Sequence, residues 1–291
     1  MTDDELITVL EAEGIPVTDA CRILELSRAS FYRRRAADAP RGAVAEASAE
    51  ESALTEAIRE LAGLHPAWGY RRITAFLCRK RSLKVNRKRV RRIMRVCGLS
   101  VPLKRYKAKR TETRSKPHPT KPNQWWGTDM TKFYVEHIGW IYLVVVLDWY
   151  TKRAIGHALS LRPSTALWLQ ALAQAVETAC PLGSRAYEIN LMSDNGSQPT
   201  SIRYENAVAT LGINHVTTSY NNPKGNADTE RFMRTFKEEV VWPTEFESLE
   251  EATAAVETFF RFYNQDYPHS ALGGLSPIDF ENSLNQTAVA A

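Results

Sequence analysis

Residues 125–160 read WWGTDMTKFYVEHIGWIYLVVVLDWYTKRAIGHALS and contain three runs rich in aromatic and β-branched residues. The polar breaks between the runs are too short for crossover connections, so the stretch predicts three strands of an antiparallel meander. Further along, the pattern predicts a helix over about 165–179, a strand in YEINLMSD, a helix near 200–211, a short strand INHVTT, and helices over about 226–241 and 250–264. We therefore expect an α/β domain with a mixed five-stranded sheet and helices on both faces.

Three carboxylates occupy unusual places in this pattern. Asp129 falls in the middle of the first predicted strand, Asp194 ends the fourth, and Glu230 lies in the first turns of a helix. A carboxylate in a strand centre needs a partner or a metal, because an isolated buried charge is heavily penalised. Converging carboxylates favour hard cations such as Mg²⁺ or Mn²⁺. Taken singly, Asp194 is explained as well by a turn and Glu230 better by an exposed helix surface, so only the set of three predicts a metal centre.

The predicted helix that carries Glu230 has two faces in projection. One flank is apolar, as expected for a side that packs on a core: Met233, Phe236 and Val240. The other carries an amide, the glutamate and two cations: Asn226, Glu230, Arg234 and Lys237. We interpret this stripe as facing a long polyanionic substrate. The alternative is a surface pair between Glu230 and Arg234, worth a few tenths of a kcal/mol.

Positive charge is concentrated in one part of the chain. The 291 residues carry a net charge of +5, yet residues 71–116 hold 19 Lys and Arg against one acid. Residues 1–70 and 117–291 are net acidic, at −6 and −7. Such a block neutralises phosphates and releases counterions, which is typical of nucleic-acid binding. The alternative is a solvated basic face or tail.

Within the basic block, Asn86 and Gly98 bracket a predicted helix with one apolar and one cationic side. The apolar side comprises Val90, Ile93, Met94 and Cys97. The cationic side, which we expect to contact DNA phosphates, comprises Lys88, Arg91, Arg92 and Arg95.

Residues 15–36 predict two short helices in a helix-turn-helix arrangement. The second helix ends in three further cations expected to contact DNA: Arg33, Arg34 and Arg35. We expect the chain to divide into a helix-turn-helix module at 1–40, a basic helical, helix-turn-helix-like DNA-binding region at 41–112, a linker at 113–123, an α/β core at 124–285 and a tail at 286–291.

No segment predicts insertion into a membrane. The longest apolar run, 140–147, is far shorter than the roughly 20 residues that span a bilayer, and the acidic start MTDDELITVLEAEG differs from a signal peptide. The cysteines form no CxxC pair and predict buried, reduced thiols rather than disulfides or a zinc site: Cys21, Cys78, Cys97 and Cys180. We therefore expect a cytoplasmic protein.

The acidic motifs resemble the integrase-type catalytic core shared by retroviral integrases and the insertion-sequence transposases of the family numbered three, whose product is usually called OrfB. The matching stretches are WWGTDMTKF around Asp129, MSDNGSQPTS around Asp194 and GNADTERFMRTFKEE around Glu230. The 35 residues between Asp194 and Glu230 give the family's DDE spacing, and Lys237 follows the glutamate by seven. Asn195, Pro199 and the Gly225–Ala227 stretch depart from the usual motifs without removing an acid.

The resemblance extends beyond the acids. The stretch YNQDYPHSALGGLSPIDFE, at residues 263–281, resembles the family's closing motif. The stretches HPAWGYRRITAFL and VNRKRVRRIMRVCGL resemble its helix-turn-helix-like region ahead of the core.

This resemblance implies an RNase H-like fold and a transposase that cuts and joins DNA strands at the ends of an insertion sequence by in-line attack on phosphodiesters. It implies that Asp129, Asp194 and Glu230 are catalytic and ligate two divalent ions, Mg²⁺ or Mn²⁺, with Asp129 bridging them. Four residues would position the DNA ends: Lys237, Arg234, Asn226 and Asn195. The implied partners are double-stranded DNA (terminal inverted repeats and target), further copies of the chain on DNA, and an upstream OrfA protein, separate or joined by frameshifting.

Two other functions remain open at this point. A non-catalytic, sequence-specific DNA-binding regulator or a degenerate transposase remnant would work through the helical modules and leave the three acids unused. A nuclease of the RNase H type acting on RNA–DNA hybrids would leave the basic block and the helical modules without a function.

Overall fold

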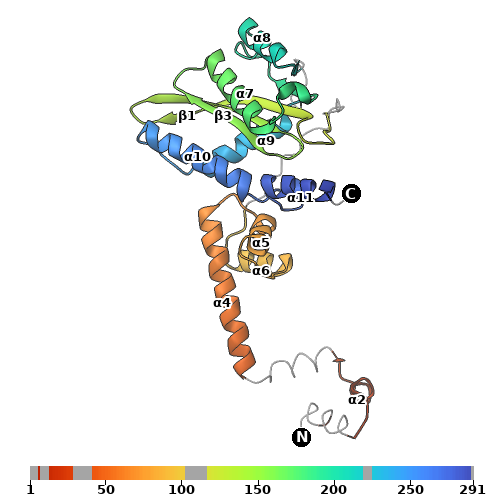
Figure 1. The fold of residues 1–291 in the computed structure, drawn as a ribbon. Coiled ribbons are helices and arrows are strands. Elements are labelled where there is room, and N and C mark those ends of the chain that lie inside the picture. The colour runs from red at the N-terminus through yellow and green to blue at the C-terminus, as the bar shows by residue number, and fades with distance from the viewer. Residues whose placement is uncertain (1–5, 7–12, 29–40, 102–116, 219–224, 290–291) are drawn as a thin grey trace, which may run out of the picture. The chain divides into compact units, whose positions relative to one another are not determined.

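The computed structural model describes residue 6 and residues 13–28, 41–101, 117–218 and 225–289 (Figure 1). The chain forms two compact units, Met1–Glu60 and Leu61–Ala291. In the first unit, α2 (Val17–Ile23) buries Ala20 and Cys21, and α4 (Arg41–Leu64) begins there and ends in the second unit. The helix expected to end in Arg33, Arg34 and Arg35 lies outside the described residues.

A mixed five-stranded sheet forms the centre of the second unit, in the order β3-β2-β1-β4-β5. The strands are β1 (Trp125–Val135), β2 (Gly139–Asp148), β3 (Ala154–Ser160), β4 (Asn190–Ser193) and β5 (Asn214–Thr217). The first three pair antiparallel, which confirms the predicted meander, whereas β4 runs parallel to β1 and β5 parallel to β4. This is the RNase H-like arrangement that the resemblance implies.

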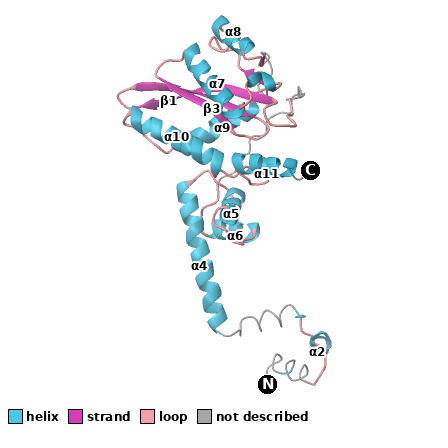
Figure 2. Cartoon of the chain, viewed as in Figure 1, coloured by secondary structure: helices cyan, strands magenta, loops and turns pink. Residues whose placement is uncertain are grey.

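Helices cover both faces of the sheet, as predicted (Figure 2). One face packs on α7 (Thr165–Ala179) and α8 (Ile202–Thr210) through a core that includes Trp126, Val144, Trp168 and Tyr204. The other face lies against α9 (Ala227–Phe236) and α10 (Leu249–Gln265), and the π-helical continuation of α9, η2 (Lys237–Val241), packs on α10. Along β1, the alternation of side chains sends Trp126 to the α7 face and its neighbour Gly127 to the α9 face.

The basic block forms two short helices, α5 (Tyr70–Arg79) and α6 (Arg87–Val96). Asn86 caps α6, since its side chain accepts a hydrogen bond from the Lys88 backbone N–H at 2.8 Å. The predicted two-sided character of α6 is confirmed for its core side, where Val90, Ile93 and Met94 are buried, while Cys97 is half-buried.

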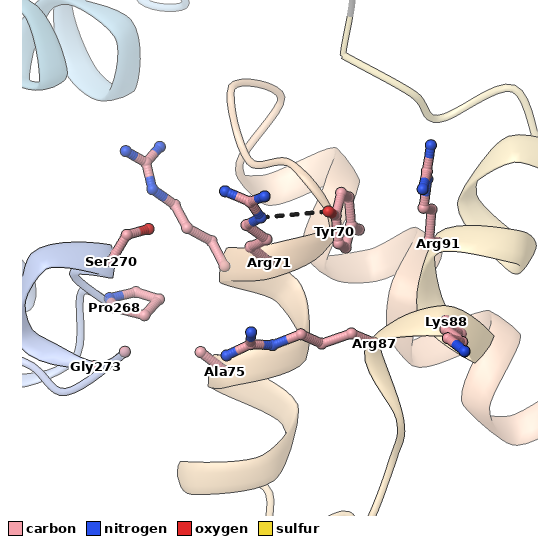
Figure 3. Close-up of a pocket in the computed structure, with 11 residues that line it drawn as sticks. Tyr70, Arg71, Ala75, Arg87, Lys88, Arg91, Pro268, Ser270 and Gly273 are labelled. Carbon is pink, nitrogen blue, oxygen red and sulfur yellow. Dashed lines mark hydrogen bonds between the residues drawn. The ribbon is translucent and has the colours of Figure 1, made fainter.

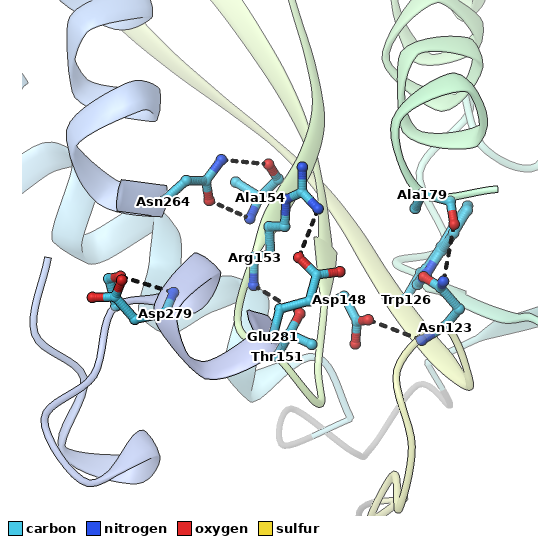
Figure 4. Close-up of polar contacts among 11 residues, drawn as sticks. Asn123, Trp126, Asp148, Thr151, Arg153, Ala154, Ala179, Asn264, Asp279 and Glu281 are labelled. Carbon is cyan, nitrogen blue, oxygen red and sulfur yellow. Dashed lines mark hydrogen bonds and ion pairs between the residues drawn. The ribbon is translucent and has the colours of Figure 1, made fainter. Parts of the chain in front are cut away.

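A C-terminal helix, α11 (Pro277–Val289), begins within the closing motif and was not expected from periodicity. Polar contacts attach it to the sheet: Arg153 Nη1 lies 2.7 Å from Glu281 Oε2 (Figure 4). Beside it, the side chain of Asn264 hydrogen-bonds both backbone groups of Ala154, at 3.0 and 2.9 Å. Tertiary polar contacts, together with the packing of Phe280 on Tyr150, therefore position this end of the chain.

The cysteine prediction is correct in part. All four are free thiols, but Cys78 is exposed and donates to the Val85 carbonyl, whereas Cys21 and Cys180 are buried. In the described part of the chain, no helix has the length and apolar character needed to cross a membrane.

Candidate active site

Two of the three acids lie side by side because of the pairing between β1 and β4. These strands are parallel, with Gly127 opposite Met192; Asp129 lies two residues further along β1, and Asp194 directly follows the end of β4, near enough for its charge to act on Asp129. Neighbouring strands are about 4.8 Å apart, and level residues in a parallel pair point to the same face. The central strand therefore presents Asp129 next to the start of the loop that carries Asp194.

The third acid arrives on α9, which approaches the same face of β1. A Cβ atom at Gly127 would collide with Thr229 Oγ1 and Trp149 Nε1, so the missing side chain is what admits the helix. Asp129 shares the face of Gly127, two residues on, and Glu230 follows Thr229 directly. Glu230 thereby comes near enough to Asp129 for its negative charge to raise the pKa of that residue.

Two side-chain hydrogen bonds hold the beginning of α9 on the sheet. Asn226 Nδ2 donates to the Thr128 carbonyl at 3.0 Å, and Trp149 Nε1 donates to Thr229 Oγ1 at 3.2 Å. Asn226 is 5% exposed. Its location therefore differs from the surface stripe predicted from the sequence, because the residue directly precedes the helix and turns its amide inward to the Thr128 carbonyl.

The loop after β4 is held by its own contacts. Asp194 Oδ1 accepts from the Gly196 backbone N–H at 3.2 Å, and the Ser193 hydroxyl donates to the Asp194 carbonyl at 2.8 Å. The same hydroxyl lies 2.9 Å from His215 Nε2 on β5. Asn195 uses its amide to donate to the Thr218 carbonyl, so its side chain closes this loop.

The pKa of Asp129 shows that the three acids interact electrostatically. Burial above all, together with the negative charges of Asp194 and Glu230, raises the pKa of Asp129 to about 6, against the lowering effects of the hydrogen bond from the Met130 N–H and of the charge of Lys237. Burial also raises the pKa of Glu230. A shared negative field of this kind favours binding of a cation.

The donor set suits a divalent metal, but the side chains are not gathered around one point. All three predicted ligands offer carboxylate oxygens, the donors that Mg²⁺ and Mn²⁺ prefer. Among the described residues, however, no three His, Cys, Asp or Glu side chains lie close enough together to hold a metal ion. The structure therefore shows three carboxylates on one face within electrostatic reach, without a closed coordination shell.

The cations of the predicted stripe have distinct surroundings. Lys237 is half-buried, and its charge reaches Asp129. Arg234 is exposed and pairs with Glu238, with Nε 2.7 Å from Oε1, rather than forming the expected alternative pair with Glu230. The four cations of α6 expected to contact DNA are all exposed: Lys88, Arg91, Arg92 and Arg95.

Gly127, Trp149 and Thr229 position the site, and the sequence analysis did not select them. A signal for Gly127 was present, since a glycine inside a strand marks a bulge or the close approach of another segment. Trp149 and Thr229 carry no such local signal, because their hydrogen bond joins residues 80 positions apart.

The comparisons with known proteins agree with this geometry. Models of the "Integrase core domain" match residues 119–223 and 211–277, and a model of the "HTH-like domain" matches residues 49–107. The transposase for insertion sequence element IS904 from Lactococcus lactis is 31% identical over 245 residues, which cover 80% of this chain and 94% of the relative. The InsK protein of insertion sequence element IS150 from Escherichia coli is 30% identical, covering 92% and 94%.

Among solved structures, the catalytic core domain of BIV integrase aligns with a TM-score of 0.42 at 20% identity, covering 57% of this chain and 99% of that one. The relatives of insertion sequences carry the assignment, since they match nearly end to end. The chain belongs to the insertion-sequence transposases, DNA polynucleotidyl transferases with an integrase core domain.

Proposed function

We propose that Asp129, Asp194 and Glu230 are the catalytic acids with which this transposase cuts and joins DNA strands at the ends of its element. The observation that carries the proposal is the arrangement around β1, where the parallel pairing with β4 leaves Asp194 near Asp129 and Gly127 admits the helix bearing Glu230. A regulator without catalytic activity has no use for a glycine that brings a third carboxylate to this face.

The three carboxylates would hold two Mg²⁺ or Mn²⁺ ions, with Asp129 as the shared ligand. Bound there, the ions would supply activation of the attacking hydroxyl and stabilisation of the leaving oxygen. The chain contributes orientation: Asp129 is fixed on the central strand, the loop contacts of Ser193 fix Asp194, and the hydrogen bonds of α9 fix the start of the helix that bears Glu230.

DNA would contact the exposed cations of α6 and, nearer the acids, Lys237, Arg234 and Asn195. Asn226 would position α9 rather than touch DNA, because it is buried. We propose that three further cations also contact DNA: Arg33, Arg34 and Arg35. The proposed substrates are the element's terminal inverted repeats and a target duplex.

Joining two ends requires two active sites held together, so we include self-association on DNA in the proposal. An OrfA protein, separate or fused by frameshifting, would be a further partner, and the protein would act in the cytoplasm. The proposed domain organisation is the one expected from the sequence: helix-turn-helix module 1–40, basic region 41–112, linker 113–123, catalytic core 124–285 and tail 286–291.

The test is an assay of cleavage and strand transfer with purified full-length chain, Mg²⁺ and labelled inverted-repeat ends. Asp194→Asn should lower the rate of cleavage and strand transfer by more than about 100-fold and should leave DNA binding intact. Loss of a group that only supports a metal ligand costs less, about 10–100-fold. Asp266→Asn is the matched control, since this carboxylate pairs with Lys80 away from the site. Equal activity of wild type and Asp194→Asn would refute the assignment. Digestion of RNA–DNA hybrids without end joining would favour the nuclease instead.

A further inference from the structure

A cleft lies between α5, α6 and the turn of the closing motif (Figure 3). Its volume is about 350 Å³. The α5 and α6 side supplies five cations: Arg71, Arg72, Arg87, Lys88 and Arg91. The opposite side comes from the segment containing Pro268, Ser270, Gly273 and Gly274. Segments almost 200 residues apart in sequence thus form one cationic cleft.

The charge of the cleft is uncompensated within the described structure. None of its described lining residues is acidic, and among the described residues no carboxylate forms an ion pair with any of these five cations. Cations that share a cleft of this size lie largely within the Debye length of about 8 Å at 0.15 M salt, so they repel one another. A bound polyanion would attract each of these cations and so offset their mutual repulsion.

Aromatic rings support several of the cations in place of carboxylates. The guanidinium groups of Arg71 and Arg91 lie 5.8 and 5.6 Å from the centre of the Tyr70 ring, and that of Arg72 lies 5.0 Å from the Tyr267 ring. Arg71 also donates from Nε to the Tyr70 hydroxyl at 3.2 Å. Ring contacts restrain these side chains but leave most guanidinium N–H groups for a ligand, which lowers the entropy lost on binding.

The turn on the other side is shaped to approach α5. Gly273 and Gly274 have φ values of 66° and 85°, the left-handed region that favours glycine. A Cβ atom at Gly274 would lie 3.0 Å from Ala75 Cβ, and Arg79 Nη2 donates to the Gly273 carbonyl at 3.2 Å. The turn is thereby held against α5, and it leaves Ser270 exposed at the cleft.

We propose that this cleft binds the phosphates of one DNA strand, with Arg71, Arg72, Arg87 and Ser270 as contacts that add to those of α6. The proposal rests on the proposed function, because it takes the transposase's DNA as the ligand. DNA fits better than a small anion because the cleft continues into the exposed cations of α6. From Arg87 to Arg95 this helix runs for about 12 Å, so its cations extend past more than one phosphate of a strand.

The experiment measures binding of full-length protein to a labelled duplex of inverted-repeat sequence at several salt concentrations. Each phosphate contact contributes about 0.9 to the slope of log Kd against log salt. Arg71→Gln/Arg87→Gln should therefore lower the slope by about 1.8. At 0.15 M salt, each contact is worth a factor of about (1 M/0.15 M) to the power 0.9, so the double variant should bind about 30-fold more weakly.

Three variants make the test specific. Arg71→Lys/Arg87→Lys keeps the charges and should retain most of the slope, while circular dichroism checks that each variant is folded. Ser270→Glu places a carboxylate in the cleft and should weaken binding, whereas Asn282→Glu adds the same charge on an exposed part of α11 outside the cleft and should not.

The outcomes separate this proposal from the proposed function. If the wild type binds and cleaves DNA but Arg71→Gln/Arg87→Gln keeps its slope and affinity, the cleft is not a phosphate site and the transposase assignment stands. If the wild type binds DNA but does not cleave it, the catalytic proposal is wrong, while the difference in slope between wild type and Arg71→Gln/Arg87→Gln still decides the cleft. Loss of both slope and affinity in the double variant, with recovery in the lysine variant, supports the cleft.

Discussion

Replacing Gly127 with alanine tests whether the approach of α9 to β1 builds the active site. The added methyl group would collide with Thr229 Oγ1 and Trp149 Nε1, and would lie 2.7 Å from Asn226 Oδ1. All three neighbours belong to packed segments, and Thr229 and Asn226 lie at the start of α9. The helix must therefore move outward, and Glu230 must move with it.

The expected loss of stability follows from these contacts. Overpacking of a well-packed interior costs about 1–3 kcal/mol. Outward movement also strains the Trp149–Thr229 and Asn226–Thr128 hydrogen bonds, each worth about 0.5–1.5 kcal/mol. The free energy of unfolding should fall by about 2–6 kcal/mol, a large part of the 5–15 kcal/mol typical of a domain. Because a misplacement of about 1 Å at a catalytic group costs about 100-fold in rate, strand transfer should fall by about that factor.

Gly156→Ala provides the matched control for this change. A Cβ atom there would collide with the Ala171 carbonyl and lie 2.8 Å from Ala175 N, both on α7, so it crowds the opposite face of the sheet. Both variants should lose stability in denaturant unfolding, but only Gly127→Ala should lose strand transfer per folded molecule, measured at a temperature where both are folded. Wild-type activity in folded Gly127→Ala, or an equal loss in both variants, would refute the reasoning.

Two further predictions concern stability. Burial raises the pKa of Asp148 to about 6 from its ordinary 3.8, so the folded state holds this proton more tightly than the unfolded state. The resulting stabilisation, about 3 kcal/mol, should be full below about pH 4 and lost as the pH rises through 6. The difference in unfolding free energy between wild type and Asp148→Asn should therefore change by that amount across this pH range. A difference that stays constant with pH would contradict the prediction. Glu239→Ala should lower the free energy of unfolding, measured by chemical denaturation, by about 3–6 kcal/mol, because the contacts of this carboxylate to His65 and Trp68 are charge-assisted and shielded from water. Glu238→Ala is the control: it removes an exposed ion pair with Arg234 and should change the free energy of unfolding by under about 1 kcal/mol. Similar losses in the two glutamate variants would contradict this explanation.

Local patterns predicted the parts of the fold whose causes are local. The meander follows from β-branched runs with short breaks, and α6 follows from a cap and an apolar side only a few residues apart. In both cases the residues that determine the element lie within it. The placement of Asp129 in β1 and of Asp194 directly after β4 follows in the same way.

Positions that depend on distant contacts could not be predicted in this way. The helical projection treated Asn226 as part of the stripe, but its φ and ψ of −111° and 25° place it before the helix, and the Thr128 carbonyl then draws its amide inward. Arg234 takes Glu238 rather than Glu230 as its partner, a choice that spacing alone leaves open. The α11 helix is likewise attached through Arg153, which lies 128 residues away from its partner.

The helix that carries Glu230 also anchors the DNA-binding segment. Glu239, nine residues on, accepts from Trp68 Nε1 at 2.8 Å and lies 2.7 Å from His65 Nδ1, just ahead of α5. Nine residues rotate an α-helix by about 900°, so Glu230 and Glu239 face roughly opposite sides, and the π turn at Lys237–Val241 adjusts the second side. One end of this continuous segment thus carries Glu230, and the other end holds the loop that leads into α5 and its cleft. About 14 Å of packed helix therefore separates the third carboxylate from the residue that holds the loop ahead of α5.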